Sequence, residues 1–194
     1  MRCDTDLMAH HHPFIVLPRP RSADYTRKPM KTLSLVRHAK SSWKDQALAD
    51  HDRPLNKRGK RDAPRMGKRL AKAGVHPDLM VTSTAVRARV TAETIAPEIG
   101  YPVAHIMMDQ EIYHAGTTGL LELIRNLGDA NDHVMLFAHN PVITELVNHL
   151  TGSDLENVPT CGIAHIRFET DSWRNVGSAA AELLEFDYPK RIDD

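Results

Sequence analysis

Short apolar runs alternate with amphipathic segments along most of this chain. Blocks of four to six mainly apolar residues, bounded by polar ones, predict strands. They cover residues 32–36, 79–82, 103–108 and 133–138, and two further strands over 163–168 and 181–186 close the chain. Between the first four strands and after the fourth, apolar residues recur at helical spacing. These segments predict helices over 62–73, 84–96, 117–127 and 141–150.

Asparagine, proline and glycine residues mark several expected helix ends. Asn56 is a good helix cap, but Pro64 is tolerated only in a first turn or at a kink. We therefore expect the first helix to begin near Asp62 and to end at Gly74. Pro141 suits the first turn of the helix that follows the strand over 133–138.

The alternation of strand and helix predicts an α/β fold with three layers, αβα. A mostly parallel central sheet would carry helices on both of its faces. The last two predicted strands follow each other without an intervening helix, so one of them can run antiparallel. Ligand sites in such sheets lie beyond the carboxyl ends of the strands. Polar residues at those ends are therefore the candidates for function.

Composition divides the chain into two parts. Residues 1–29 contain His10, His11, His12 and four prolines, and they show no amphipathic period. We expect them to form a disordered N-terminal extension, with the histidines in a solvated tail rather than a metal site. Residues 30–194 have the length and apolar content of one domain with a real core.

Global charge gives no sign of an anionic partner. The chain has 25 Lys and Arg residues and 25 Asp and Glu residues, so its formal net charge is zero. This balance argues against a nucleic-acid partner. No stretch approaches the roughly 20 apolar residues of a membrane helix. With two cysteines only, we expect a cytoplasmic protein whose anion affinity comes from a local cluster.

Such a cluster is predicted where three strands end. Arg37 and His38 end the first strand, Arg87 follows the second strand closely, and His139 ends the fourth strand. Guanidinium groups match the geometry of phosphate oxygens, and a neutral imidazole is a nucleophile. The Asp, Glu, His and Cys residues show no metal-ligand spacing. We therefore expect an anion site that needs neither a metal nor a cofactor.

Three sequence blocks resemble the histidine phosphatase (phosphoglycerate mutase-like) superfamily. Arg37-His38-Ala39 resembles its Arg-His-Gly signature, the run 83–93 around Arg87 resembles its second block, and His139-Asn140-Pro141 resembles its Gly-His-Asn-Pro block. The resemblance covers about residues 30–186. It is closest to the small branch typified by SixA, the phosphohistidine phosphatase, which also shows runs such as Asp52-Arg53-Pro54-Leu55.

The resemblance implies a role for each matching residue. His38 corresponds to the nucleophile, and Arg37 and Arg87 correspond to the arginines that clamp the phosphate. His139 corresponds to the second histidine, which hydrogen-bonds the phosphoryl group. The resemblance also implies a phosphoglycerate mutase-like fold.

Two further candidates and two departures follow from the same comparison. Ser41 lies where the family often places another phosphate-facing residue, and Glu111 lies roughly where larger members keep the proton donor. Ala39 replaces the signature glycine, as is common in the SixA-like branch. Lys44 replaces an asparagine of the mutase-type members, which favours a hydrolase over a mutase.

We therefore expect a metal-independent phosphatase that forms a covalent phosphohistidine on His38. The expected substrate is a phosphohistidine on a partner protein, because the chain is short and shows no large insertion that could close over a small metabolite. One alternative is a phosphatase of the same fold that acts on small phosphate esters. The other is a module that binds phosphorylated protein without turnover, which the intact His38 disfavours.

Overall fold

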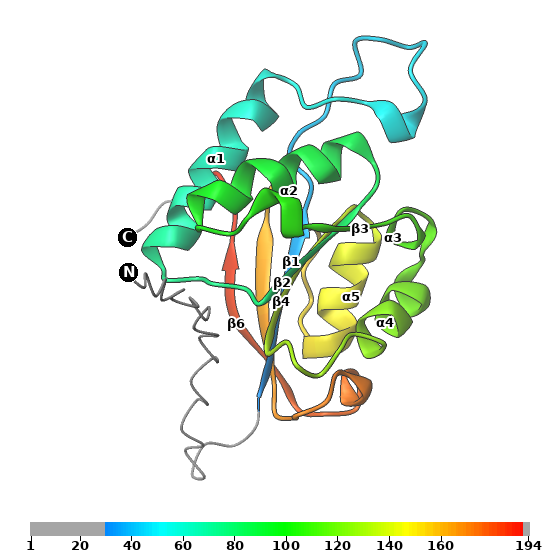
Figure 1. Ribbon diagram of the computed structural model, residues 1–194. Helices are drawn as coiled ribbons and strands as arrows, with labels where there is room; N and C mark the ends of the chain where they lie inside the picture. Colours follow the sequence, from blue (N-terminus) through cyan, green and yellow to red (C-terminus); the bar gives the residue numbers. More distant parts are fainter. Residues whose placement is uncertain (1–29, 192–194) are drawn as a thin grey trace, which may run out of the picture.

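The computed structural model describes residues 30–191, so the predicted extension over residues 1–29 lies outside the described range. Six strands form one sheet in the order β3-β2-β4-β1-β5-β6 (Figure 1). The strands are β1 (Lys31–Arg37), β2 (Leu79–Ser83), β3 (Met107–Asp109), β4 (His133–Ala138), β5 (Ile163–Phe168) and β6 (Ala181–Asp187). Strands β3, β2, β4 and β1 are parallel, while β5 runs antiparallel to both β1 and β6. The mostly parallel sheet and the one antiparallel strand near its end confirm the predicted topology.

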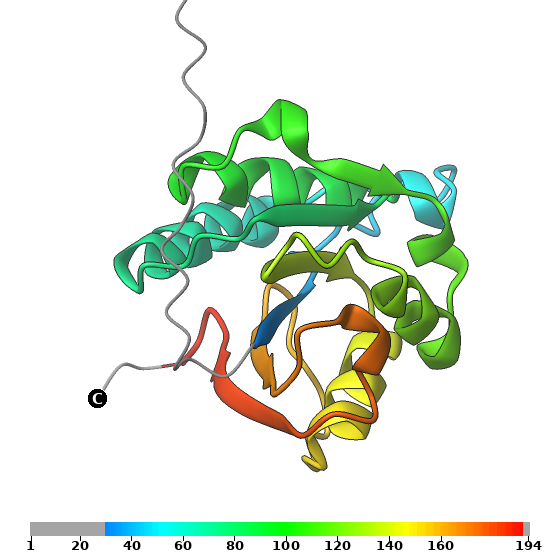
Figure 2. The same ribbon diagram turned by 60° about the horizontal axis from the view of Figure 1, so that its bottom comes forward.

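Helices cover both faces of this sheet. They are α1 (Lys57–Lys72), α2 (Val86–Glu98), α3 (Glu111–His114), α4 (Thr117–Arg125) and α5 (Val142–Thr151). Short 3-10 turns occur at η1 (Asp50–Asp52), η2 (Val103–His105) and η3 (Trp173–Asn175). Helices α1 and α2 lie on one face, and α4 and α5 lie on the other, with the sheet between them (Figures 1 and 2). The predicted three-layer α/β fold is confirmed.

The pleat of β4 shows why its sequence is apolar without interruption. Met135 and Phe137 pack in the core beneath α1 and α2, whereas Val134 and Leu136 pack in the core beneath α4 and α5. Alternate side chains of a strand point to opposite faces, so a central strand covered on both sides needs apolar residues throughout.

None of the helices within residues 30–191 has the length and apolar character that crossing a membrane requires.

The predicted start of the first helix is wrong. Helix α1 begins at Lys57 rather than near Asp62, and Pro64 lies inside it. The Asn56 side chain accepts a hydrogen bond from the backbone N–H of Gly59 at 2.9 Å, which caps the helix. This cap and the buried apolar face of the helix together offset the one hydrogen bond that the proline removes.

The third predicted strand is also shorter than expected. Residues Val103–His105 form a 3-10 turn, and only Met107–Asp109 pair with β2. Met107 and Met108 are 57% and 61% exposed, because β3 is the edge strand of the sheet. The apolar residues of this segment predicted a longer strand, but an exposed edge strand gains little from burying such side chains and stays short.

Candidate active site

The carboxyl ends of β1, β2 and β4 meet at one edge of the sheet. Arg37 of β1 pairs with Ala138 of β4. His38 follows Arg37 and His139 follows Ala138, so the two histidines lie at the same level of the sheet edge. Arg87 lies in the first turn of α2, shortly after β2 ends. A cavity of about 510 Å³ opens at this edge. Five of the six predicted site residues line it: Arg37, His38, Ser41, Arg87 and His139.

His38 is held with one ring nitrogen unprotonated. Its side chain is 8% exposed, and Nδ1 lies 2.7 Å from the carbonyl oxygen of Ala39. A carbonyl only accepts, so Nδ1 carries the proton and Nε2 keeps its lone pair. Burial, reinforced by the charges of Arg87 and Arg37 and opposed by the bond to the Ala39 carbonyl, lowers the pKa of His38 to about 3. The imidazole is therefore neutral at physiological pH.

Arg87 connects this imidazole to a carboxylate. Its Nε donates to His38 Nε2 at 3.3 Å, while Nη1 and Nη2 donate to the Asp50 carbonyl and to Asp50 Oδ2 at 2.5 and 2.8 Å. Asp50 also pairs with Arg53 at 2.8 Å and accepts from the Tyr113 hydroxyl at 3.0 Å. Burial alone would raise the pKa of Asp50, but Arg87, Tyr113 and Arg53 outweigh it and hold that pKa below its usual value. Asp50 is thus an ionised carboxylate shared by two arginines.

Arg37 is oriented by the segment that precedes β5. Its Nη1 donates to Asn157 Oδ1 at 2.9 Å and to the Val158 carbonyl at 2.7 Å. Its Nε is buried and has no partner among the described residues, and the same holds for Nη1 of Arg53. Buried donors without partners are costly, so these two guanidiniums are suited to receive an anion.

The second histidine of the site is also neutral. Burial lowers the pKa of His139, the charges of Arg87 and Arg37 lower it further, and Asp50 opposes them. Its ring lies 5.9 Å from that of Tyr113. A neutral imidazole carries one N–H donor, so His139 can donate to an oxygen of a bound anion.

Glu111 does not join this group. It is exposed at the first position of α3, its backbone N–H bonds to Asp109 Oδ1 at 2.8 Å, and it does not line the cavity. The carboxylate that lines the cavity is Asp50, and Tyr113 and Arg53 line it as well. The sequence offered only a weak signal for these residues, because Arg53 stands in the Asp52-Arg53-Pro54-Leu55 run while Asp50 precedes it.

Four cationic side chains face the cavity. Arg37, Arg53, Arg87 and Lys40 line it. Within residues 30–191, no group of three or more His, Cys, Asp or Glu side chains is arranged to hold a metal ion. Guanidinium groups and neutral imidazoles around a polar cavity are suited chemically to a phosphoryl-type anion.

Comparison with known proteins agrees with this geometry. The model of the histidine phosphatase superfamily (branch 1) matches residues 33–120. An uncharacterised protein of Mycobacterium tuberculosis is 32% identical over 171 residues, which cover 80% of this chain and 100% of that protein.

Two solved structures named as proposed phosphohistidine phosphatases SixA are similar throughout. The one from Agrobacterium tumefaciens is 30% identical with a TM-score of 0.69, covering 82% of this chain and 98% of that one. The one from Nakamurella multipartitia is 25% identical with a TM-score of 0.71, covering 84% and 98%. The chain therefore belongs to the histidine phosphatase superfamily, within its SixA-like branch, and is a phosphatase.

Proposed function

We propose that this phosphatase hydrolyses phosphohistidine on a partner protein through a covalent phosphohistidine on His38. The observation that carries the proposal is the state of the His38 ring. Its Nδ1 proton is held by the Ala39 carbonyl, so Nε2 keeps its lone pair and lies 3.3 Å from Nε of Arg87 in a cavity lined by arginines. The names of the two SixA neighbours support the choice of substrate.

The first step transfers the phosphoryl group to the enzyme. The lone pair on His38 Nε2 attacks phosphorus and forms a new P–N bond. The P–N bond to the substrate imidazole breaks, and its electron pair stays on the leaving imidazole. Arg37 and Arg87 hold the phosphoryl oxygens and balance their charge in the transition state, while His139 and Ser41 donate further hydrogen bonds.

The second step returns His38 to its starting state. Water attacks the phosphorus, a P–O bond forms, and the P–N bond to His38 breaks with its electron pair returning to Nε2. The proton of the attacking water passes to Asp50, which is ionised and lies 2.8 Å from Nη2 of Arg87. We assign this role to Asp50 in place of Glu111, because Glu111 lies outside the cavity.

The state of Asp50 also bears on the substrate. An alkoxide leaving group needs a proton from an acid, but the pKa of Asp50 is held below its usual value. The imidazole of a phosphohistidine can be protonated on its other nitrogen before the bond breaks, so it leaves without help. The site is therefore better suited to a phosphohistidine than to a phosphate ester.

The test compares substrates and traps the intermediate. We expect a higher kcat/KM on a histidine-phosphorylated phosphorelay domain than on a panel of small phosphate esters. His38→Ala should lower kcat by at least about a thousandfold and should leave no acid-labile phosphate on the enzyme. His149→Ala, which changes an exposed histidine on α5, is the matched control and should behave as wild type.

Each part of the proposal has its own contrary result. Normal turnover by His38→Ala would refute the covalent mechanism. A higher kcat/KM on an ester than on the phosphohistidine domain would instead assign the site to small substrates. Asp50→Asn should slow hydrolysis of the intermediate, so that label accumulates on His38. Unchanged turnover without accumulation would remove Asp50 from the mechanism.

A further inference from the structure

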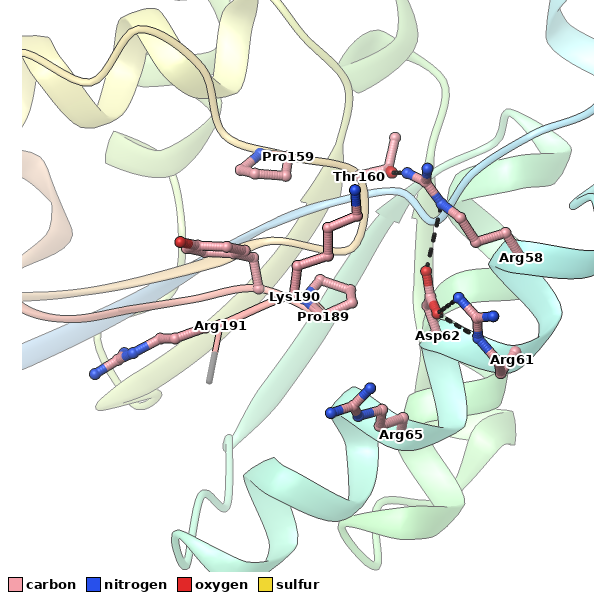
Figure 3. Close-up of a pocket in the computed structure, with 10 residues that line it drawn as sticks. Arg58, Arg61, Asp62, Arg65, Pro159, Thr160, Pro189, Lys190 and Arg191 are labelled. Carbon is pink, nitrogen blue, oxygen red and sulfur yellow. Dashed lines mark hydrogen bonds and ion pairs between the residues drawn. The ribbon is translucent and has the colours of Figure 1, made fainter. Parts of the chain in front are cut away.

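A second and larger cavity opens beside the active site, between the outer side of α1 and the segment that follows β6. Its volume is about 720 Å³. We call it the basic groove, after the charged side chains that line it: Arg58, Arg61, Arg65, Lys190 and Arg191. Figure 3 shows Arg65 extending from α1 toward the 188–191 segment, and the Lys190 amine pointing toward Thr160. None of these residues takes part in the proposed mechanism.

The basic groove adjoins the catalytic cavity. Thr160 lines both of them. Nη2 of Arg58 donates to Thr160 Oγ1 at 2.9 Å, so the groove begins at the rim of the site that contains His38. A ligand bound in the groove can therefore extend directly to the catalytic cavity.

The charge of the groove is strongly one-sided although the whole chain is neutral. Helix α1 contains eight Lys and Arg residues and a single acid, Asp62. Asp62 is buried and already pairs with Arg61 at 2.9 Å and with Arg58 at 3.5 Å. The side chains of Arg65 and Lys190 are exposed and form no ion pair with any other residue in the 30–191 range. No acid of the 30–191 range therefore neutralises these two cations of the groove.

We propose that the basic groove docks an acidic segment of the phosphoprotein that delivers its phosphoryl group to His38. This inference rests on the proposed function and names the kind of partner. Charge complementarity selects Asp and Glu side chains. The α1 residues that line the groove run from Arg58 to Arg65, about 10 Å along the helix axis, and they lie outside the catalytic cavity that a small phosphate ester would occupy. Pro159, Tyr188 and Pro189 add apolar lining that suits a polypeptide.

The experiment reverses single charges in the groove and compares two substrates. Arg65→Glu and Lys190→Glu should each lower kcat/KM by about tenfold on a histidine-phosphorylated domain with an acidic surface. Both should leave kcat/KM on free phosphohistidine unchanged. The matched control is Arg174→Glu, an equal charge change at an exposed position in η3, which should act as wild type on both substrates.

Two further measurements separate docking from catalysis. Added salt should weaken wild-type turnover of the acidic domain more than that of Arg65→Glu, because screening acts on the contacts that the variant lacks. Calorimetry with the unphosphorylated acidic domain should show binding to wild type and weaker binding to both groove variants. This measurement requires no turnover, so a failure of the proposed function would leave it interpretable.

Several outcomes would overturn the inference. Equal losses on the acidic domain and on free phosphohistidine would show that the groove cations serve the catalytic cavity itself. No loss on either substrate would show that nothing docks there. Unchanged binding of the acidic domain, combined with groove-dependent binding of a single-stranded oligonucleotide or of phosphatidylserine vesicles, would assign the groove to a different polyanion.

Discussion

Thr91 connects the catalytic strand end to the helix that carries Arg87. Its hydroxyl donates to the Arg87 carbonyl at 2.6 Å and accepts from the backbone N–H of Ala39 at 2.9 Å. Thr91 and Ala39 are both fully buried. Ala39 in turn supplies the carbonyl that fixes the ring of His38. We therefore expect Thr91 to act as a positioning residue for the nucleophile and for the arginine beside it.

The substitution Thr91→Val keeps the shape of the side chain and removes the hydroxyl. The Ala39 N–H then stays buried without a partner, which costs about 1–3 kcal/mol of folding free energy. A shift of the His38 ring by a fraction of an ångström should lower kcat by about 10- to 100-fold. KM should change little, because the donors of Arg37 and Arg87 remain.

Helix α2 provides a matched control. Thr94 makes the same type of bond to the Val90 carbonyl, at 2.6 Å, but receives none from the catalytic strand end. Thr94→Val should therefore change the free energy of unfolding by less than about 0.5 kcal/mol and leave kcat unchanged. Thr91→Ser restores the hydroxyl and should recover most of kcat.

Urea unfolding and steady-state kinetics on the three variants test whether Thr91 positions the catalytic groups. If Thr91→Val and Thr94→Val behave alike in both assays, the reasoning is refuted. If Thr91→Val loses stability but keeps its kcat, the bond is structural only. A kcat for Thr91→Ser as low as that of Thr91→Val would also contradict a positioning role.

Three further predictions concern pH, packing and metals. Ser34 Oγ lies 2.7 Å from both His133 Nε2 and His165 Nδ1, and burial lowers the pKa of each histidine to about 4. Between about pH 4 and 6.5 the unfolded chain therefore binds more protons than the folded one. The free energy of unfolding, measured in urea, should fall as the pH drops through this window, by up to about 1.4 kcal/mol per pH unit for each histidine. A free energy that does not change with pH would contradict this prediction. Gly59→Ala would place Cβ 2.3 Å from the Lys40 carbonyl oxygen and should cost about 1–3 kcal/mol, seen as a lower Tm, whereas an unchanged Tm would show that the backbone yields easily. Turnover should survive excess EDTA, and complete loss would argue against a phosphate site made only of protein groups.

Local pattern predicted the elements of this fold better than their ends. The uninterrupted apolar run over 133–138 predicted β4 because a central strand is buried on both faces. The start of α1 could not be predicted because two local signals compete there. Pro64 argues against a helix around it, whereas the Asn56 cap favours one, and only the buried face against α2 decides between them.

Some residues of the candidate site could likewise be predicted from the sequence, and others could not. Arg37 is the last residue of β1, and His38 and His139 directly follow β1 and β4. The topology of the sheet brings the three together, so their proximity could be predicted from the sequence. Asp50 lies in the long segment between β1 and α1, whose path depends on tertiary contacts such as the stacking of Arg53 on Trp43 at 3.4 Å. No periodicity predicts such a path.

Glu111, the proton donor expected from the sequence, lies only two residues from a side chain that lines the cavity. Glu111 and Tyr113 are two residues apart in α3, and residues two apart on a helix point about 200° away from each other. Tyr113 therefore faces the cavity and holds Asp50, while Glu111 is exposed. The sequence pointed to this segment but could not determine which side of its single turn faces the cavity.

The net charge of this protein does not describe its local surfaces, because its charges are segregated in space. A formal charge of zero argued against a nucleic-acid partner and left any anion affinity to a local cluster. In the folded chain, however, guanidiniums gather at the carboxyl edge of the sheet, and the exposed face of α1 continues the same sign away from it. Electrostatic steering depends on the local potential within about a Debye length, roughly 10 Å, rather than on the total charge. A neutral chain can therefore bind both a phosphoryl group and the acidic surface around it, provided that the fold places its cations along one continuous face.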